Sequence, residues 1–89
     1  MSAAGTRYMH EVRKLSCLIC RKMGIRQESP TAAHHCFDTT HRSDFLTVPL
    51  CYEHHQGAGG FHGLGQRAFE MRYKTDETHL VGETIGKII

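Results

Sequence analysis

Two short pairs of cysteine and histidine residues constrain the fold of this chain more than any other feature. Cys17 and Cys20 are separated by two residues, and Cys51 and His54 repeat that spacing later in the chain. Two intervening residues allow a tight turn that points both donor atoms at one ion, and zinc accepts thiolate and imidazole ligands together in a tetrahedral site. The spacing predicts a structural zinc ion held by all four residues.

The length of the chain explains why a metal is expected. With 89 residues the chain supports a single domain, residues 1–89, and so small a domain is rarely stable through apolar packing alone. In peptides a zinc site contributes about 10 to 16 kcal/mol coupled to folding, which exceeds the net stability of a typical domain. No charged leader precedes an apolar run, so a reducing compartment is expected, where thiolates on a metal are favoured over disulfides.

Other uses of the cysteines remain open at this stage. A redox-active Cys-x2-Cys pair belongs in a thioredoxin-like strand and helix pattern, which does not surround Cys17 and Cys20. Structural disulfides would require an oxidising compartment. Cys36 lies in an expected strand and is predicted to be a small buried apolar residue outside the zinc site.

The pattern of apolar and polar residues predicts an α+β fold with one β-hairpin and flanking helices. Residues 1–6 are small and polar and are interpreted as a mobile end, and residues 7–15 have the apolar spacing of a short helix. Residues 31–37 and 45–50 predict the two strands. The polar run between the strands includes His41, which is expected to be a loop residue.

The second half of the chain predicts a loop and two helices. The glycine-rich residues 56–65 indicate a tight loop, followed by a helix that begins near Leu64 and runs to about Lys74. Residues 75–89 predict a C-terminal helix capped by Thr75 or Asp76, with an inner face made of Leu80, Val81, Ile85 and Ile88. No apolar run approaches the roughly 20 residues that cross a bilayer, so no membrane association is expected.

The chain contains eight histidines, and those between His34 and His62 form the second unusual feature. Adjacent His34 and His35 must point to opposite faces of a strand, so they should have different roles. One would bind a divalent ion, and the other would act as a general base, because the ordinary histidine pKa of about 6.5 lies near working pH. A surface site for adventitious metal, or simply solvated polar residues, is the alternative.

The order of these motifs resembles a known family. The chain contains the following segments in order: Ala33-His34-His35, Val48-Pro49-Leu50-Cys51, His54-His55-Gln56-Gly57 and Gly60-Phe61-His62-Gly63. Together they resemble the HNH endonucleases of the ββα-metal (His-Me finger) type, and most closely the small phage-borne members related to recombination-enhancement nucleases, in which zinc knuckles brace the hairpin. The resemblance implies a zinc-stabilised ββα-metal core over residues 17–74.

The resemblance also implies roles for individual residues. His35 would be the general base, and His34, His55 and His62 would hold a catalytic Mg²⁺, Mn²⁺, Ni²⁺ or Zn²⁺ ion. The family uses an asparagine to orient the loop that carries the base, but this chain has no asparagine. Asp44, together with Ser43, is the nearest polar substitute. The implied reaction is metal-assisted hydrolysis of DNA with low sequence specificity.

Contacts to DNA are expected from basic residues, with Arg42 and Arg67 as the main candidates, although each could equally be a solvated surface residue. Sequence choice would require a homodimer, a protein partner or a preformed DNA structure, because so small a chain can read few bases. The phage resemblance implies a protein that works in the cytoplasm of a bacterial host. Two alternatives remain: a zinc module that binds nucleic acid or protein without cutting, and a zinc store or purely structural zinc core.

Overall fold

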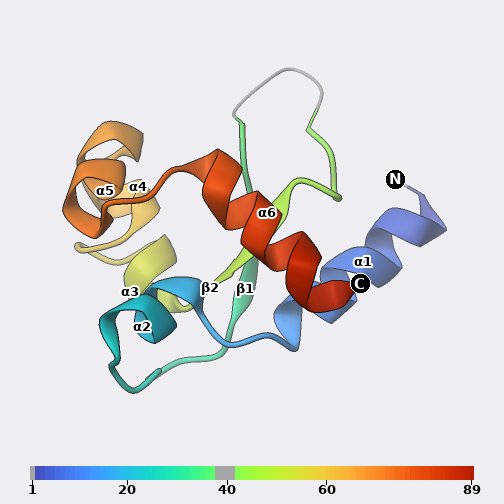
Figure 1. The fold of residues 1–89 in the computed structure, drawn as a ribbon, viewed down its shortest axis with the longest axis horizontal. Coiled ribbons are helices and arrows are strands. Elements are labelled where there is room, and N and C mark those ends of the chain that lie inside the picture. The colour runs from blue at the N-terminus through green and yellow to red at the C-terminus, as the bar shows by residue number, and fades with distance from the viewer. Residues whose placement is uncertain (1, 38–41) are drawn as a thin grey trace.

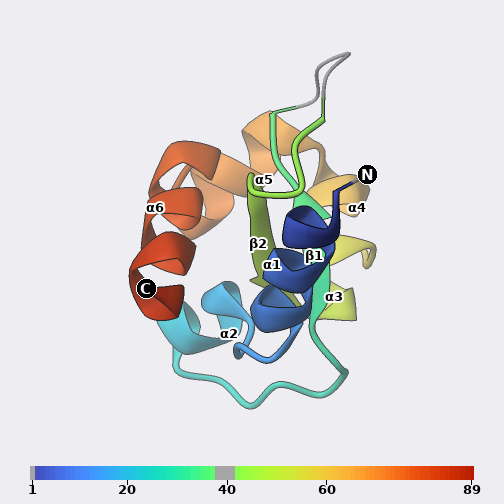
Figure 2. The same ribbon diagram turned by 90° about the vertical axis from the view of Figure 1, so that its right-hand side faces the viewer.

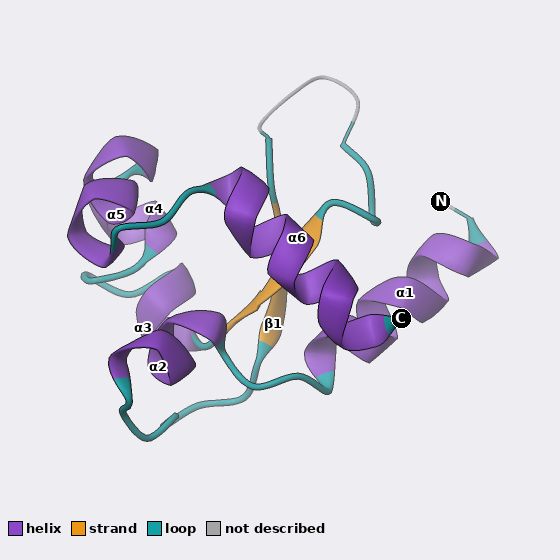
Figure 3. Ribbon diagram, in the orientation of Figure 1, coloured by secondary structure: helices purple, strands orange, loops and turns teal. Residues whose placement is uncertain are grey.

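The computed structural model describes residues 2–37 and 42–89 and confirms the predicted α+β class. A two-stranded antiparallel sheet is surrounded by short helices (Figures 1 and 3). The elements are α1 (Ala3–Arg13), α2 (Leu18–Met23), β1 (Ala32–His35), β2 (Thr47–Leu50), α3 (Tyr52–His55), α4 (Phe61–Leu64), α5 (Gln66–Tyr73) and α6 (Glu77–Ile88). The predicted loop residue His41 lies outside the described residues.

The hairpin pairs His34 with Val48 and His35 with Thr47. Both strands are shorter than predicted, for reasons visible at their ends. Phe37 has a left-handed φ of 58°, which turns the chain just after β1. Before β2, the N–H of Leu46 donates to the carbonyl of Ser43 at 3.1 Å and closes a turn. These turns leave a compact hairpin whose two faces carry different side chains.

Helices cover the hairpin from several sides. In Figure 1, α6 crosses in front of the strands, α3, α4 and α5 lie to their left, and α1 lies to their right. In Figure 2, which is turned by 90° from Figure 1, α6 lies to one side of the strands and no longer overlaps them. The core is formed by apolar side chains of α2, β2, α5 and α6, namely Leu18, Ile19, Val48, Leu50, Phe69, Tyr73, Leu80 and Val81. Among the helices of residues 2–37 and 42–89, not one has the length and hydrophobicity that crossing a bilayer requires.

From Ala3 onward, the segment that was interpreted as a mobile end, residues 1–6, belongs to a helix. The helix α1 begins at Ala3, and the hydroxyl of Ser2 caps it by accepting the N–H of Gly5 at 3.0 Å. Gly5 is buried against Asp44, and a Cβ added at Gly5 would lie 2.8 Å from the Oδ2 atom of Asp44. The beginning of the chain therefore packs against the loop that carries a candidate site residue.

The segment expected to be a loop over residues 56–65 contains the short helix α4. The longer helix begins at Gln66 rather than near Leu64, because Gly65 has a φ of +87° that separates α4 from α5. Residues 56–60 separate α3 from α4. The rings of Phe61 and His62 at the start of α4 lie 4.3 and 5.4 Å from the ring of His34 between centroids, so α4 packs against the hairpin.

The C-terminal helix was predicted correctly at its start and incorrectly along its inner face. The Asp76 carboxylate caps α6 by accepting the N–H of His79 at 2.8 Å. Leu80 and Val81 are buried as expected, but Ile85 is 38 % exposed. Thr84 takes the buried position, because its hydroxyl can donate to the carbonyl of Leu80 at 2.8 Å.

Candidate metal centres

Each predicted ligand pair lies at the start of a short helix. Cys17 directly precedes α2, and Cys51 directly precedes α3. The second ligand of each pair, Cys20 or His54, follows three residues later and therefore lies on the same side of the first turn. The side chain of Gln27 fixes the first turn further, since its Oε1 accepts the N–H of Cys17 at 2.7 Å.

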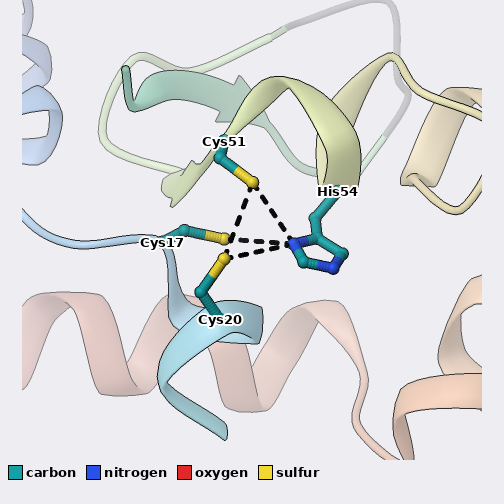
Figure 4. Close-up of side chains that lie close together, drawn as sticks. All are labelled: Cys17, Cys20, Cys51 and His54. Carbon is teal, nitrogen blue, oxygen red and sulfur yellow. Dashed lines mark hydrogen bonds between the residues drawn. The ribbon is translucent and has the colours of Figure 1, made fainter. Parts of the chain in front are cut away.

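The four donor atoms of these pairs point toward one another (Figure 4). The Nδ1 atom of His54 lies 3.3, 3.5 and 3.7 Å from the sulfurs of Cys51, Cys20 and Cys17. The Sγ atoms of Cys20 and Cys51 are 3.7 Å apart. In a zinc tetrahedron the edges are about 3.8 Å between two sulfurs and about 3.5 Å between sulfur and nitrogen. The cluster therefore has the geometry of a structural metal site such as zinc.

The cysteines form no disulfide. All four are free thiols, and the 3.7 Å between the sulfurs of Cys20 and Cys51 is far longer than the roughly 2.05 Å of a disulfide bond. Burial, followed by the neighbouring Cys17, raises the pKa of Cys20 to about 12. Burial also lowers the pKa of His54, so its imidazole is neutral and able to ligate. A metal that binds here must displace thiol protons, which makes its affinity pH-dependent.

A second cluster combines histidines from β1, α3 and α4. Ligand atoms of His34, His55 and His62 all lie within 4.8 Å of one another. The ring centroids are 5.0 Å apart for His34 and His55, and 4.8 Å apart for His55 and His62. The structure thus brings together the three residues that the family resemblance implies as ligands of a catalytic ion. Three imidazoles suit a zinc, nickel or other borderline transition-metal ion.

The three histidines differ in their exposure to solvent. His34 is buried, His55 is half-buried and His62 is exposed. Burial, followed by the positive fields of neighbouring histidines, lowers the pKa of His34 to about 3, and burial also lowers the pKa of His55. Both rings are neutral near pH 7 and could accept a metal without first losing a proton. Exposure of His62 leaves the cluster open on one side.

His35 has different surroundings from its neighbour, as adjacent residues on a strand should. Its Nε2 atom lies 3.0 Å from Oδ1 of Asp44, and both side chains are partly exposed. The turn before β2 holds Asp44 in place, because the hydroxyl of Thr47 donates to the carbonyl of Asp44 at 2.9 Å. The structure therefore pairs the two residues that were predicted as base and asparagine substitute.

A pocket of about 600 Å³ connects these groups. His34, His35, His55 and His62 all line it, and so does the exposed Arg42. Arg67 is exposed on α5 but does not line the pocket; its neighbour Gln66 does. Of the two basic residues predicted to contact DNA, only Arg42 is placed beside the histidines.

Glu77 belongs to the same pocket, and no sequence pattern pointed to it. This residue is 3 % exposed, and its carboxylate accepts the N–H of Phe37 at 2.8 Å. It forms a buried group with His34 and Cys36. The predicted burial of Cys36 is confirmed, and burial together with the Glu77 carboxylate raises the pKa of the Cys36 thiol. An acidic residue at the first position of a helix is common, so its local sequence carried no signal.

No protein-family model matches the chain, and neither the curated proteins nor the solved structures contain a significant match to it.

Proposed function

We propose that the protein is a metal-dependent endonuclease of the HNH type, which hydrolyses phosphodiester bonds in DNA with low sequence specificity. One observation carries the proposal: three imidazoles able to hold a divalent ion line the same pocket as His35, which is paired with Asp44. Metal-assisted hydrolysis requires an ion and a general base on either side of one phosphate. The hairpin with α3 and α4 would form a compact ββα-metal unit.

His35 is the proposed general base. The Asp44 carboxylate would accept the N–H of its Nε2 at the observed 3.0 Å, which orients the ring and selects the tautomer. The lone pair of Nδ1 is then free to take a proton from a water molecule. Both side chains are slightly more than one-fifth exposed, so water can reach them. Asp44 thereby performs the orienting role for which the chain has no asparagine.

His34, His55 and His62 are the proposed ligands of the catalytic ion. A divalent ion bound there would supply Lewis-acid stabilisation of the charge that grows on the phosphate and on the leaving 3′ oxygen. Arg42, at the edge of the pocket, would contact a neighbouring phosphate and add affinity without sequence choice. The exposed side of the cluster at His62 is where the DNA backbone would enter.

The buried cluster of cysteines would brace the catalytic one. Cys51 and His54 anchor both ends of α3 to α2, and His55 is the next residue in that short helix. Because a helix of four residues has little stability of its own, its orientation depends on such anchors. A zinc ion on the cysteines would thus fix the direction in which His55 points.

The direct test is nicking of supercoiled plasmid by zinc-loaded protein in the presence of Mg²⁺, Mn²⁺ or Ni²⁺. His35→Ala should slow nicking by about 10²- to 10⁴-fold, the usual contribution of a general base. His10→Ala is the matched control, because His10 is exposed on α1 and does not line the pocket. No nicking with any ion, or equal rates for the parent and His35→Ala, would contradict the proposal.

A zinc-stabilised module that binds nucleic acid or a protein partner without cutting is the second candidate. The absence of asparagine favours it, because the family relies on that residue to organise the base. Fluorescence anisotropy with a labelled DNA duplex separates the two functions. Binding that persists in every ion condition without any strand cleavage would favour the second candidate.

A further inference from the structure

Glu77 is a carboxylate in an unusual place. It is the first residue of α6 and is only 3 % exposed. It contacts Phe37, which follows β1 and lies forty residues earlier in the chain. Its Oε2 atom accepts the N–H of Phe37, which has a left-handed φ of 58°. Burying a carboxylate is costly unless it is fully hydrogen-bonded, and the Phe37 N–H and the neighbouring Cys36 thiol leave acceptor capacity on its two oxygens. These two contacts therefore do not fully account for this residue.

A further candidate donor to the Glu77 carboxylate is His34. Its Nε2 atom is fully buried and has no hydrogen-bond partner among the residues that the structure describes, although buried polar atoms nearly always have one. The Oε2 atom of Glu77 lies 3.9 Å from it. At 3.9 Å this contact is longer than a hydrogen bond. A neutral imidazole has one N–H, which it can place on either nitrogen.

We propose that Glu77 is a positioning residue that accepts the N–H of His34 Nε2 and leaves Nδ1 to hold the ion shared with His55 and His62. The inference rests on the metal site of the proposed function. Histidine ligands commonly donate their second N–H to a carboxylate, which fixes the tautomer, orients the ring and raises its basicity. Shortening the separation from 3.9 Å to a hydrogen bond requires a movement of about 1 Å.

The arrangement of the clusters favours positioning over direct ligation by Glu77. The ligand atoms divide into one group of His34, His55 and His62 and another of His34, Cys36 and Glu77. His34 belongs to both groups. Within residues 2–37 and 42–89, no set of ligand atoms that all lie within 4.8 Å of one another contains Glu77 together with His55 and His62. The carboxylate therefore lies behind His34, where it can act on the ring but not on an ion centred among the imidazoles.

Calorimetric titration of the zinc-loaded protein with Ni²⁺ tests the effect on affinity, since imidazole suits nickel well. Glu77→Gln keeps the size of the side chain and an acceptor for Phe37, and it should weaken Ni²⁺ binding by about 10- to 100-fold. Glu83→Gln removes the same charge from an exposed position of the same helix and should change the affinity by less than about twofold, within the scatter of surface substitutions. A Ni²⁺ isotherm that survives His55→Ala would overturn the site itself.

Nitrogen-15 NMR of the histidine side chains tests the orientation without any variant. We expect His34 of the zinc-loaded parent to carry its proton on Nε2, and Glu77→Gln to shift it toward a mixture of the two tautomers. A parent His34 protonated on Nδ1, or an unchanged Ni²⁺ affinity in Glu77→Gln, would overturn the proposal. Neither measurement involves DNA, so the positioning role can fail while the nuclease function stands, and the reverse also holds.

Discussion

Two clusters of metal-ligand residues meet at the end of α3, and they are built in opposite ways. His54 belongs to a set of four buried donors whose separations match a closed tetrahedron. His55 belongs to three imidazoles beside a pocket of about 600 Å³, and the third of them, His62, is exposed. Structural zinc sites are closed, whereas catalytic metal sites keep an open position. Under the proposed function, adjacent residues of one helix would therefore belong to a structural site and a catalytic site.

This division also explains why the closed cluster is embedded in the core. Its cysteines pack with Leu18, Ile19 and the buried side chains of β2, so they belong to the same apolar cluster that holds the helices together. The open cluster instead lies where the hairpin, α3, α4 and the start of α6 meet at a pocket. Changes to the closed cluster should therefore affect folding, and changes to the open cluster should affect activity.

The largest expected effect is loss of the fold in Cys51→Ser. Zinc binding contributes about 10 to 16 kcal/mol in comparable peptides, and a domain has only about 5 to 15 kcal/mol of net stability. Circular dichroism at 25 °C should show an unfolded chain even with added zinc. Cys36→Ser is the matched control, because Cys36 is equally buried but outside the tetrahedron, and its variant should stay folded with one zinc. A folded Cys51→Ser protein would refute the structural role.

The next effect concerns the proposed base and its partner. Asp44→Ala should slow plasmid nicking by about 10- to 100-fold, less than removal of His35 itself, because the base remains but loses its orientation. Thermal unfolding should change little, since Asp44 is partly exposed. Asp44→Asn should retain more activity than Asp44→Ala, because its amide oxygen can still accept from His35. Equal nicking rates for the parent, Asp44→Ala and Asp44→Asn would show that Asp44 does not contribute to the reaction.

A smaller effect should appear in the pH dependence of stability. Burial holds the pKa of His34 at about 3 in the folded chain, against about 6.5 when unfolded, so the unfolded state binds more protons as the pH falls below 6.5. Between pH 7 and pH 5 this should remove about 2 kcal/mol from the free energy of unfolding. Urea titrations of the zinc-loaded protein without added ion should show a loss about 2 kcal/mol larger in the parent than in His34→Gln, because both proteins share the pH dependence of the cysteine cluster. Equal losses in the two proteins would disprove it.

The smallest effect compares two glycines. A methyl group at Gly5 would press on the Asp44 side chain, whereas a methyl group at Gly86 would meet no atom within 4 Å. Gly86→Ala should therefore raise the free energy of unfolding by about 0.5 to 1 kcal/mol and leave nicking unchanged. Gly5→Ala should gain less stability and slow nicking severalfold by displacing Asp44. Faster or unchanged nicking in Gly5→Ala would show that α1 does not support the pair.

The features predicted correctly were those encoded over a few residues. The two ligand pairs followed from their spacing, and the different surroundings of His34 and His35 followed from the alternation of side chains along a strand. The helix cap at Asp76 was also predicted from the residues next to it in the sequence. In each case the information lay within about four positions of the residue concerned, which is the range over which backbone geometry decides direction.

The features that were missed depend on contacts between distant segments. The burial of Gly5 depends on Asp44, and that of Glu77 depends on Phe37 and His34. The phase of α6 also could not be predicted, because Thr84 becomes a suitable core residue only once its hydroxyl bonds to the preceding turn. Glu77 is the most instructive case, since its local sequence is that of an ordinary helix start.

If α3 carries a structural ligand and a catalytic ligand side by side, His55→Ala should abolish nicking without loss of zinc or fold. The measurement is the rate of plasmid nicking per zinc-containing chain, with the zinc content determined on the same sample. We expect one retained zinc per chain, a native circular dichroism spectrum and a loss of nicking of about 100-fold or more. Nicking at the parental rate, or loss of the zinc together with the fold, would contradict it.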